Sequence, residues 1–162
     1  MSSATNPRND GPNGGADRGV DRLDLRRLRR AADFYFVRHG ESEGNRVGKI
    51  LGRLDLGLSD LGRKHARAAG RFFAERLTVG NAAAYLATSP LSRCRETAQL
   101  IAEEAGVAKP VIMDELIELD AGVFAGKSLS RIAEETPEAF GAFRVHSWEA
   151  VEAAERIASL YA

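Results

Sequence analysis

Two segments of the chain carry residues that could transfer a phosphoryl group. The first contains Arg38 and His39, and the second contains Arg93. A neutral imidazole is a competent nucleophile toward phosphorus, and a guanidinium can clamp phosphoryl oxygens through two parallel hydrogen bonds. Phosphoryl transfer needs little beyond positioning, positive charge around the phosphoryl oxygens and a proton for the leaving oxygen. These residues therefore indicate phosphoryl transfer with His39 as the nucleophile.

A carboxyl group could supply the proton for the leaving oxygen. Glu118 follows a short apolar run and would suit this role if the fold buries it. The same loop carries three competing carboxyl groups, those of Asp114, Glu115 and Asp120. Residue types alone leave the choice among the four open.

Three other features have simpler explanations than chemistry. Arg95 is expected to pair on the surface or to support a loop, and His65 to be a half-exposed structural residue of a helix. The tripeptide Gly126-Lys127-Ser128 matches the tail of a phosphate-binding P-loop, but the required glycine five positions earlier is Ala121. We therefore reject a P-loop.

The elements that must position these residues alternate between strands and helices. Short apolar runs predict strands over residues 33–37, 83–88 and 111–113. Capping residues and apolar spacing predict helices from Ser59 to about residue 77, from Ser89 to Gly106, near 128–136, and from about 147 to the end. Within the first of these helices, the apolar spacing rests on Leu61, Ala68, Phe72 and Leu77.

This alternation predicts an α/β fold. We expect a three-layer sandwich with a mostly parallel sheet and helices on both faces. Ligands in open sheets of this kind bind beyond the carboxyl ends of the strands. Because His39 and Arg93 both follow predicted strands, we expect them to meet at that edge.

The composition limits the class of protein. The 162 residues include 44% hydrophobic residues, 23 basic and 23 acidic residues, which allows one globular domain with a sizeable core. The balanced charge argues against a nucleic-acid or membrane-surface partner. The single cysteine, Cys94, excludes an intrachain disulfide and favours a cytoplasmic location, and no apolar run approaches the ~20 residues of a membrane span.

The first 31 residues differ in composition from the rest. We expect residues 1–31 to be a disordered or weakly ordered leader and residues 32–162 to form one domain. Within the leader, the arginine-rich residues 18–30 are either an arm that binds a polyanion or a solvated stretch diluted by aspartates.

Three blocks of sequence occur in a specific order along the domain. They are residues 36–45 (FVRHGESEGN), residues 88–98 (TSPLSRCRETA) and residues 116–126 (LIELDAGVFAG). Residues 52–66 lie where a substrate loop would lead into a helix. In this order and spacing the blocks resemble the histidine phosphatase superfamily, which includes cofactor-dependent phosphoglycerate mutases and many small phosphatases.

The resemblance implies a role for each candidate residue. His39 would be the phosphohistidine nucleophile and Glu118 the proton donor, with Arg38 and Arg93 clamping the phosphoryl group and Asn45 a polar ligand nearby. The implied substrate is a small phosphomonoester, and neither a cofactor nor a metal is expected. A phosphatase is the expected activity, and a phosphoglycerate mutase-type activity is an alternative because both classes share the blocks. The oligomeric state stays open.

The chain departs from the family pattern at two positions. Relatives have a second histidine, usually in Ser-His-Gly after a later strand, whereas His146 has no glycine after it. We therefore expect that the C-terminal part of the domain is missing from this sequence. The alternative function is a weak or inactive remnant that binds phosphorylated ligands. The second departure is Gly44, where many relatives carry an aromatic residue.

Overall fold

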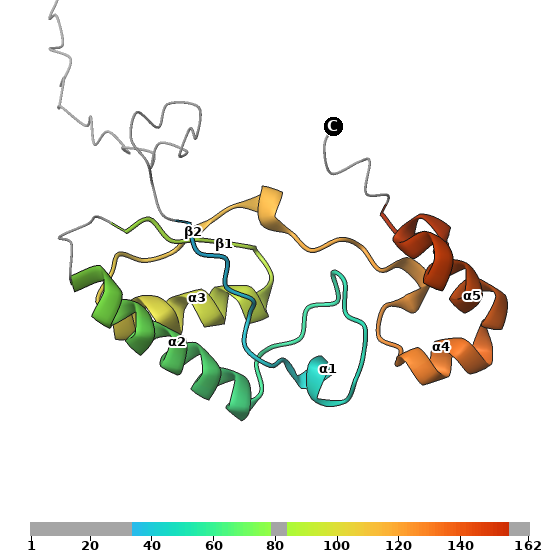
Figure 1. Cartoon of the computed structure of the whole chain (residues 1–162), viewed down its shortest axis with the longest axis horizontal. Helices are drawn as coiled ribbons and strands as arrows, with labels where there is room; N and C mark the ends of the chain where they lie inside the picture. Colours follow the sequence, from blue (N-terminus) through green and yellow to red (C-terminus); the bar gives the residue numbers. More distant parts are fainter. Residues whose placement is uncertain (1–33, 79–83, 156–162) are drawn as a thin grey trace, which may run out of the picture. The chain divides into compact units, whose positions relative to one another are not determined.

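The computed structural model describes residues 34–78 and 84–155 of the chain (Figure 1). The chain divides into two units, Met1–Phe36 and Val37–Ala162, and nearly all described residues belong to the second. The predicted leader over residues 1–31 and the end of the predicted last helix, residues 156–162, lie outside the described residues.

The second unit combines helices with two parallel strands, which confirms the predicted α/β class. Its strands β1 (Ala87–Thr88) and β2 (Val111–Ile112) pair in parallel, with Ala87 opposite Val111 and Thr88 opposite Ile112. The other elements, in chain order, are α1 (Glu43–Arg46), α2 (Asp60–Thr78), α3 (Ser92–Ala105), η2 (Asp114–Leu116), η3 (Gly122–Phe124), α4 (Leu129–Glu135), α5 (Pro137–His146) and η4 (Ser147–Ala150). Because α3 connects β1 to β2, these three elements form a βαβ crossover.

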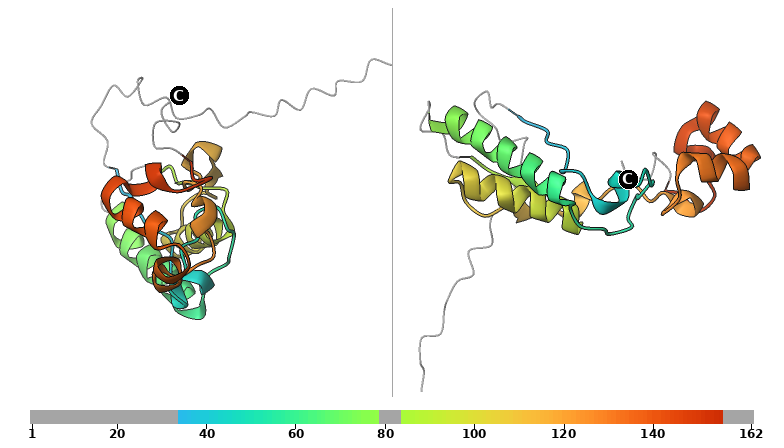
Figure 2. Two further views of the ribbon diagram at one scale, coloured as in Figure 1. Left: turned by 90° about the vertical axis from the view of Figure 1, so that its right-hand side faces the viewer. Right: turned by 90° about the horizontal axis from the view of Figure 1, so that it is seen from below.

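The helices α2 and α3 lie side by side, and small residues form part of their contact (Figures 1 and 2). Leu61 and Phe72, which helped to predict α2, are 49% and 45% exposed. Ala66 is instead buried, and a Cβ added to Gly70 would lie 3.0 Å from the carbonyl oxygen of Ile101 in α3. The predicted helix is confirmed. Because α2 approaches α3 closely, the residues of α2 at this contact are small ones rather than the bulkier apolar residues of the prediction.

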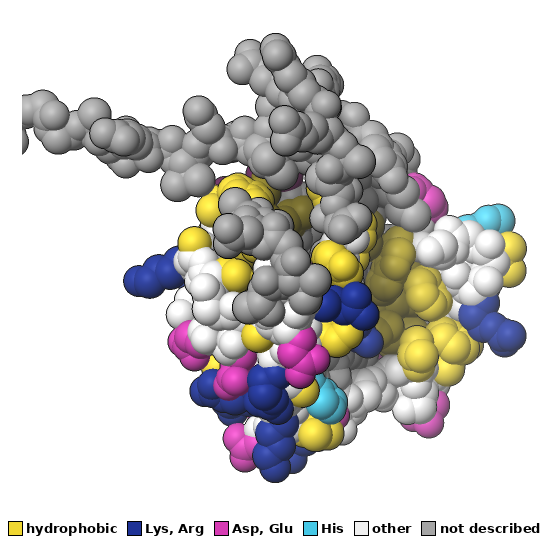
Figure 3. Space-filling model, turned by 60° about the vertical axis from the view of Figure 1, so that its left-hand side comes forward, with side chains coloured by type: hydrophobic (Ala, Val, Ile, Leu, Met, Phe, Trp, Pro, Cys, Tyr) yellow, Lys and Arg dark blue, Asp and Glu magenta, His cyan; other side chains and the backbone are white. Residues whose placement is uncertain are grey.

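Ion pairs follow the flank between α2 and α3. Arg63, Arg67 and Arg71 are spaced four residues apart on α2, and each pairs with a glutamate of α3. The N···O distances are 2.6 Å from Arg63 to Glu96, and 3.0 Å and 3.5 Å from Arg67 and Arg71 to Glu104. Basic and acidic side chains also lie next to each other on the surface shown in Figure 3. Exposed ion pairs of this kind contribute about 0–1 kcal/mol each to stability. The close contact between the two helices therefore stabilises this region more than the ion pairs do.

A second core surrounds Phe124, in the part of the chain that contains α4 and α5. Phe124 and Ile132 have no exposed surface. The ring of Phe124 packs edge-on against Phe143 of α5 and Trp148 of η4, with centroid distances of 5.6 Å and 6.4 Å. Aromatic rings therefore hold this part of the chain together.

Two predicted elements are wrong where the structure describes them. Residues 34–41 form no strand, and the side chain of Phe36 is 98% exposed. An apolar run becomes a strand only where a neighbouring strand pairs with its backbone. The composition of the run does not determine whether such a neighbour is present. The helix predicted from residue 147 is also wrong, because α5 begins earlier, with Pro137 in its first turn, and ends where Ser147 adopts a φ of 56°.

Candidate active site

The imidazole of His39 is held in one tautomer. Its Nδ1 lies 2.7 Å from the carbonyl oxygen of Gly40, and its Nε2 lies 3.3 Å from Nε of Arg93. A carbonyl can only accept a hydrogen bond and a guanidinium can only donate one. The neutral ring that satisfies both carries its proton on Nδ1. The lone pair of Nε2 therefore points toward Arg93, and Nε2 is the ring atom that could act as a nucleophile.

The surroundings of His39 keep this ring neutral. Burial lowers the pKa of His39 below its ordinary value of 6.5, and the positive charges of Arg93 and Arg38 lower it further. The hydrogen bond to Gly40 and the negative charge of Glu118 act in the opposite direction without reversing the shift. A neutral imidazole at physiological pH is the form that can attack phosphorus.

Arg93 is the largest fully buried side chain of the described residues, at 1% exposure. Besides its contact with His39, it donates from Nη2 to the carbonyl oxygen of Gly52 at 2.8 Å and from Nη1 to that of Leu54 at 3.0 Å. Within residues 34–78 and 84–155, no carboxylate forms an ion pair with this guanidinium. A buried positive charge without a negative partner is costly, so the site favours an anion beside Arg93.

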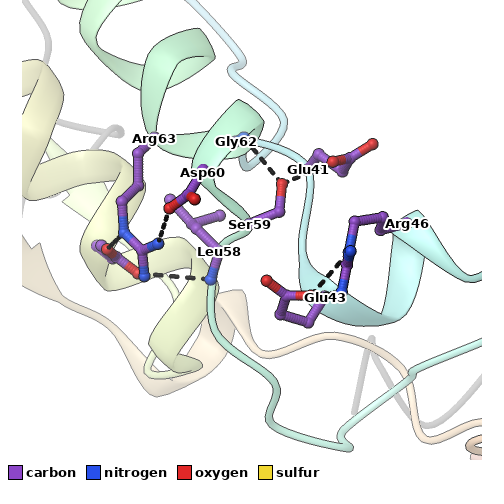
Figure 4. A network of polar contacts seen from close by, with 9 residues as sticks. Glu41, Glu43, Arg46, Leu58, Ser59, Asp60, Gly62 and Arg63 are labelled. Atoms are coloured by element: carbon purple, nitrogen blue, oxygen red, sulfur yellow. Dashed lines mark hydrogen bonds and ion pairs between the residues drawn. The ribbon is translucent and has the colours of Figure 1, made fainter.

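The loop after His39 is fixed by capping interactions (Figure 4). Ser42 and Asn45 form a capping box at α1, in which Asn45 Oδ1 accepts from the Ser42 N–H at 3.1 Å. Ser59 Oγ donates to Glu41 at 2.6 Å and accepts from the N–H of Gly62 at 3.0 Å, which ties this loop to the start of α2. Because Oδ1 of Asn45 is engaged in the cap, its amide nitrogen is the side-chain atom that could donate to an anion.

A cavity of about 280 Å³ opens beside His39. Arg38, His65 and Thr97 contribute to its lining. Arg38 is exposed, so its guanidinium is accessible to an incoming anion while its charge acts on His39. His65 is exposed on α2 rather than half-exposed, and its structural role stays a prediction.

Glu118 follows η2 and is exposed, so the condition that the fold buries it is not met. Its Oε1 accepts from the N–H of Leu119 at 3.0 Å. Of its competitors, Asp120 is committed to a turn, because its Oδ1 accepts from the N–H of Gly122 at 2.9 Å. Glu118 is also the one carboxylate among the charges that shift the pKa of His39. These observations favour Glu118 over Asp120 as the acid.

His146 lies in the last turn of α5 and is exposed. It is absent from the lining of the cavity beside His39 as far as the described residues define that lining. The expectation that His146 does not replace the second histidine of relatives stays a prediction.

Two residues that support the site escaped the sequence analysis. Asp55 Oδ1 accepts from the N–H and the hydroxyl of Ser92 at 2.8 Å and 2.7 Å, so it caps α3 from a distant loop. Thr97 Oγ1 donates to the carbonyl oxygen of Arg93 at 2.7 Å and accepts from the N–H of Gly40 at 3.0 Å. Thr97 thereby joins the backbones of the two segments that carry His39 and Arg93.

Comparison with known proteins agrees with this geometry. The profile of the histidine phosphatase superfamily (branch 1) matches residues 34–162. Phosphoglycerate mutase-like protein 4 of Arabidopsis thaliana is 36% identical over 112 residues, which cover 69% of this chain and 47% of the relative. Phosphoserine phosphatase 1 of Hydrogenobacter thermophilus is 38% identical over 105 residues, which cover 64% of this chain and 46% of the relative.

A solved structure shows the same fold. Mycobacterial glucosyl-3-phosphoglycerate phosphatase is similar with a TM-score of 0.57 and 29% identity, over 65% of this chain and 48% of that protein. The chain thus spans about half the length of the relatives that it matches. Among the described residues, no helix combines the length and the apolar character needed to cross a membrane.

Proposed function

The chain belongs to branch 1 of the histidine phosphatase superfamily, and we propose that it transfers phosphoryl groups through a phosphohistidine formed at Nε2 of His39. The observation that carries this proposal is the contact between His39 and Arg93. A buried guanidinium that no carboxylate of the described residues pairs with lies 3.3 Å from the nucleophilic nitrogen, so an anion bound by Arg93 would be held next to the attacking atom. Positioning of this kind is the main requirement of phosphoryl transfer.

In the first step, the lone pair of His39 Nε2 attacks phosphorus as the bond to the leaving oxygen breaks. The electron pair of that bond goes to the leaving oxygen, which takes the proton of the Glu118 carboxyl group and departs as an alcohol. The Nδ1–H···O bond to Gly40 stabilises the positive charge that the ring acquires when Nε2 forms its fourth bond. Arg38, Arg93 and the amide nitrogen of Asn45 would hold the phosphoryl oxygens.

In the second step, the Glu118 carboxylate accepts a proton from water, and the water oxygen attacks phosphorus. The bond between nitrogen and phosphorus breaks, inorganic phosphate leaves, and the electron pair returns to Nε2. Because Glu118 is exposed, water can reach it directly, and this favours a phosphatase over a mutase.

The proposed substrates are small phosphomonoesters. The relatives bear the names of a phosphoserine phosphatase, a glucosyl-3-phosphoglycerate phosphatase and a mutase-like protein, which supports this class. We also place the activity in the cytoplasm, since the chain has a single cysteine.

The test is to trap the phosphoenzyme. Incubation with p-nitrophenyl phosphate followed by rapid quenching is expected to leave a phosphate on the chain that is stable to base and labile to acid. His39→Ala should abolish this label. A label of the same size on the His39→Ala variant, or no label on the parent chain, would overturn the proposal.

One observation favours a second function, which is binding of phosphorylated ligands without turnover. Glu118 is exposed and its carboxylate bonds to the adjacent residue, so the acid is held less firmly than the nucleophile. Binding without any label at His39, measured by calorimetry with inorganic phosphate, would support this alternative.

A further inference from the structure

We propose that Arg53 is a positioning residue that sets the acid Glu118 relative to the nucleophile, and that Glu155 holds Arg53 in this role. The proposal rests on the phosphohistidine mechanism above and adds two residues to it. Arg53 lies in the predicted substrate loop, but the sequence assigned neither residue a role at the site.

Arg53 bridges two segments that are far from it in sequence. Its Nε donates to the backbone carbonyl oxygen of Glu118 at 3.0 Å, and its Nη2 lies 2.7 Å from Oε2 of Glu155. The two side chains of the ion pair are 38% and 23% exposed, so both are partly shielded from solvent. A planar guanidinium can make both bonds at once because its donors lie in a fixed fork.

Glu155 also holds the segment that carries the acid. Its N–H donates to the carbonyl oxygen of Asp120 at 3.1 Å, and its Oε2 accepts from the N–H of Asp120 at 3.4 Å. Residues 118 and 120 are therefore bonded to the same ion pair. The ion pair holds the Glu118 backbone through the bond from Arg53 to the Glu118 carbonyl oxygen. The Glu118 carboxylate itself bonds to the N–H of the adjacent Leu119.

The residue before Arg53 connects this pair to the nucleophile. The carbonyl oxygen of Gly52 accepts from Nη2 of Arg93, which also donates from Nε to His39. Gly52 has a φ of 52°, and a Cβ there would lie 2.6 Å from the backbone nitrogen of Ala121. Only glycine fits so close to the acid loop in this conformation. A short path of hydrogen bonds and one peptide unit thus runs from His39 through Arg93 and Arg53 to Glu118.

This path predicts a defect that depends on the leaving group. If Arg53 serves to position the acid, its loss should slow the departure of a leaving oxygen that needs a proton. It should spare a leaving group that departs as a stable anion. A residue that merely stabilises the fold would slow both alike.

The experiment compares phenyl phosphate with p-nitrophenyl phosphate, which differ by one nitro group. The rate of phosphohistidine formation is measured in single turnovers of the full chain for the parent, Arg53→Lys, Arg53→Gln and Glu155→Gln. Arg53→Lys retains a charge for Glu155 but cannot make both bonds. Glu118→Gln is the reference for a lost acid. Arg131→Gln, which removes an exposed ion pair of α4, is the matched control.

We expect the Arg53 variants and Glu155→Gln to slow phosphorylation by phenyl phosphate by about 10-fold to 100-fold, while the rate with p-nitrophenyl phosphate stays within about twofold. Glu118→Gln should show the same pattern, and Arg131→Gln neither effect. Equal slowing on both substrates, or no slowing, would overturn the positioning role. A parent chain that forms no phosphohistidine, or a Glu118→Gln variant without this pattern, would instead overturn the proposed mechanism.

Discussion

The two sides of the proposed site are built differently. On the nucleophile side, Arg93 is 1% exposed, and its guanidinium bonds to His39 and to the loop that contains Gly52 and Leu54. On the acid side, Glu118 is exposed and its carboxylate bonds to the next residue along the chain. The cores differ as well, since α2 and α3 meet through small residues, whereas rings surround Phe124.

This difference indicates a division of tasks. The proposed nucleophile would attack from one direction, and a buried network of bonds would fix that direction before the substrate arrives. The acid must exchange protons with leaving groups of different shape and then with water, which requires access to solvent. We therefore expect substitutions on the two sides to differ in what they impair.

The largest loss of stability is expected from Phe124→Ala on the acid side. Truncation of a fully buried phenylalanine costs about 3–5 kcal/mol because it removes apolar contacts and leaves a cavity. The free energy of unfolding, measured with urea, checks this value. The matched control is Val145→Ala in α5, whose side chain is 75% exposed and whose truncation should change the value by less than about 0.5 kcal/mol. Equal effects of the two substitutions would contradict the assignment of this core.

On the nucleophile side, Arg93→Lys should impair activity more than stability. A lysine keeps the charge but cannot donate to His39, Gly52 and Leu54 together. We expect turnover to fall about 10²-fold to 10³-fold, the cost of a lost preorganised donor. The control is Arg95→Lys, which changes an exposed arginine of the same helix. An Arg93→Lys variant with the turnover of the parent would show that Arg93 does not hold the phosphoryl group.

Replacement of glycine by alanine should change the stability of the chain in opposite directions in the two regions. Gly70→Ala places a Cβ 2.6 Å from Cβ of Glu104, which should destabilise the contact of α2 with α3 by about 1–3 kcal/mol. Gly141→Ala in α5 meets no atom within 4 Å and should stabilise the chain by about 0.5–1 kcal/mol, because alanine favours the helix. Thermal unfolding of both variants tests the pair. Destabilisation by Gly141→Ala would contradict the open surroundings of that position.

The smallest expected effect concerns pH. Because burial lowers the pKa of His39, the unfolded chain binds this proton more readily than the folded chain. The contribution of His39 to stability is therefore present above pH 6.5 and is lost as the pH falls through the lowered pKa of the folded state. His39→Gln should flatten the dependence of the unfolding free energy on pH in this range. An unchanged slope would show that His39 titrates alike in both states.

Local signals predicted those elements that local interactions determine. The helix α3 was predicted almost from end to end: it begins at Ser92, shortly after Pro90, and Gly106 closes it with a φ of 67°. The strand expected over residues 33–37 depends on a neighbouring strand, and the helix expected from residue 147 competes with the packing of Trp148 against Phe143. Neither condition can be read from a local pattern.

The site shows the same limit. The order of the sequence blocks singled out His39, Arg93 and Glu118, and the structure places the first two in contact. The support of these residues was not predicted, because Asp55 bonds to Ser92 across 37 positions and Arg53 to Glu155 across 102. Charged residues of this kind are common on surfaces, and only the folded backbone selects their partners.

The ring cluster around Phe124 gives the chain an optical probe of one region. Trp148 is the single tryptophan of the sequence and packs against Phe124 and Phe143, so intrinsic tryptophan fluorescence reports on the acid side alone. Far-ultraviolet circular dichroism, in contrast, is weighted toward the long helices α2 and α3. If the two transitions coincide in denaturant, the regions unfold as one cooperative unit, and if they separate, the acid side has a stability of its own.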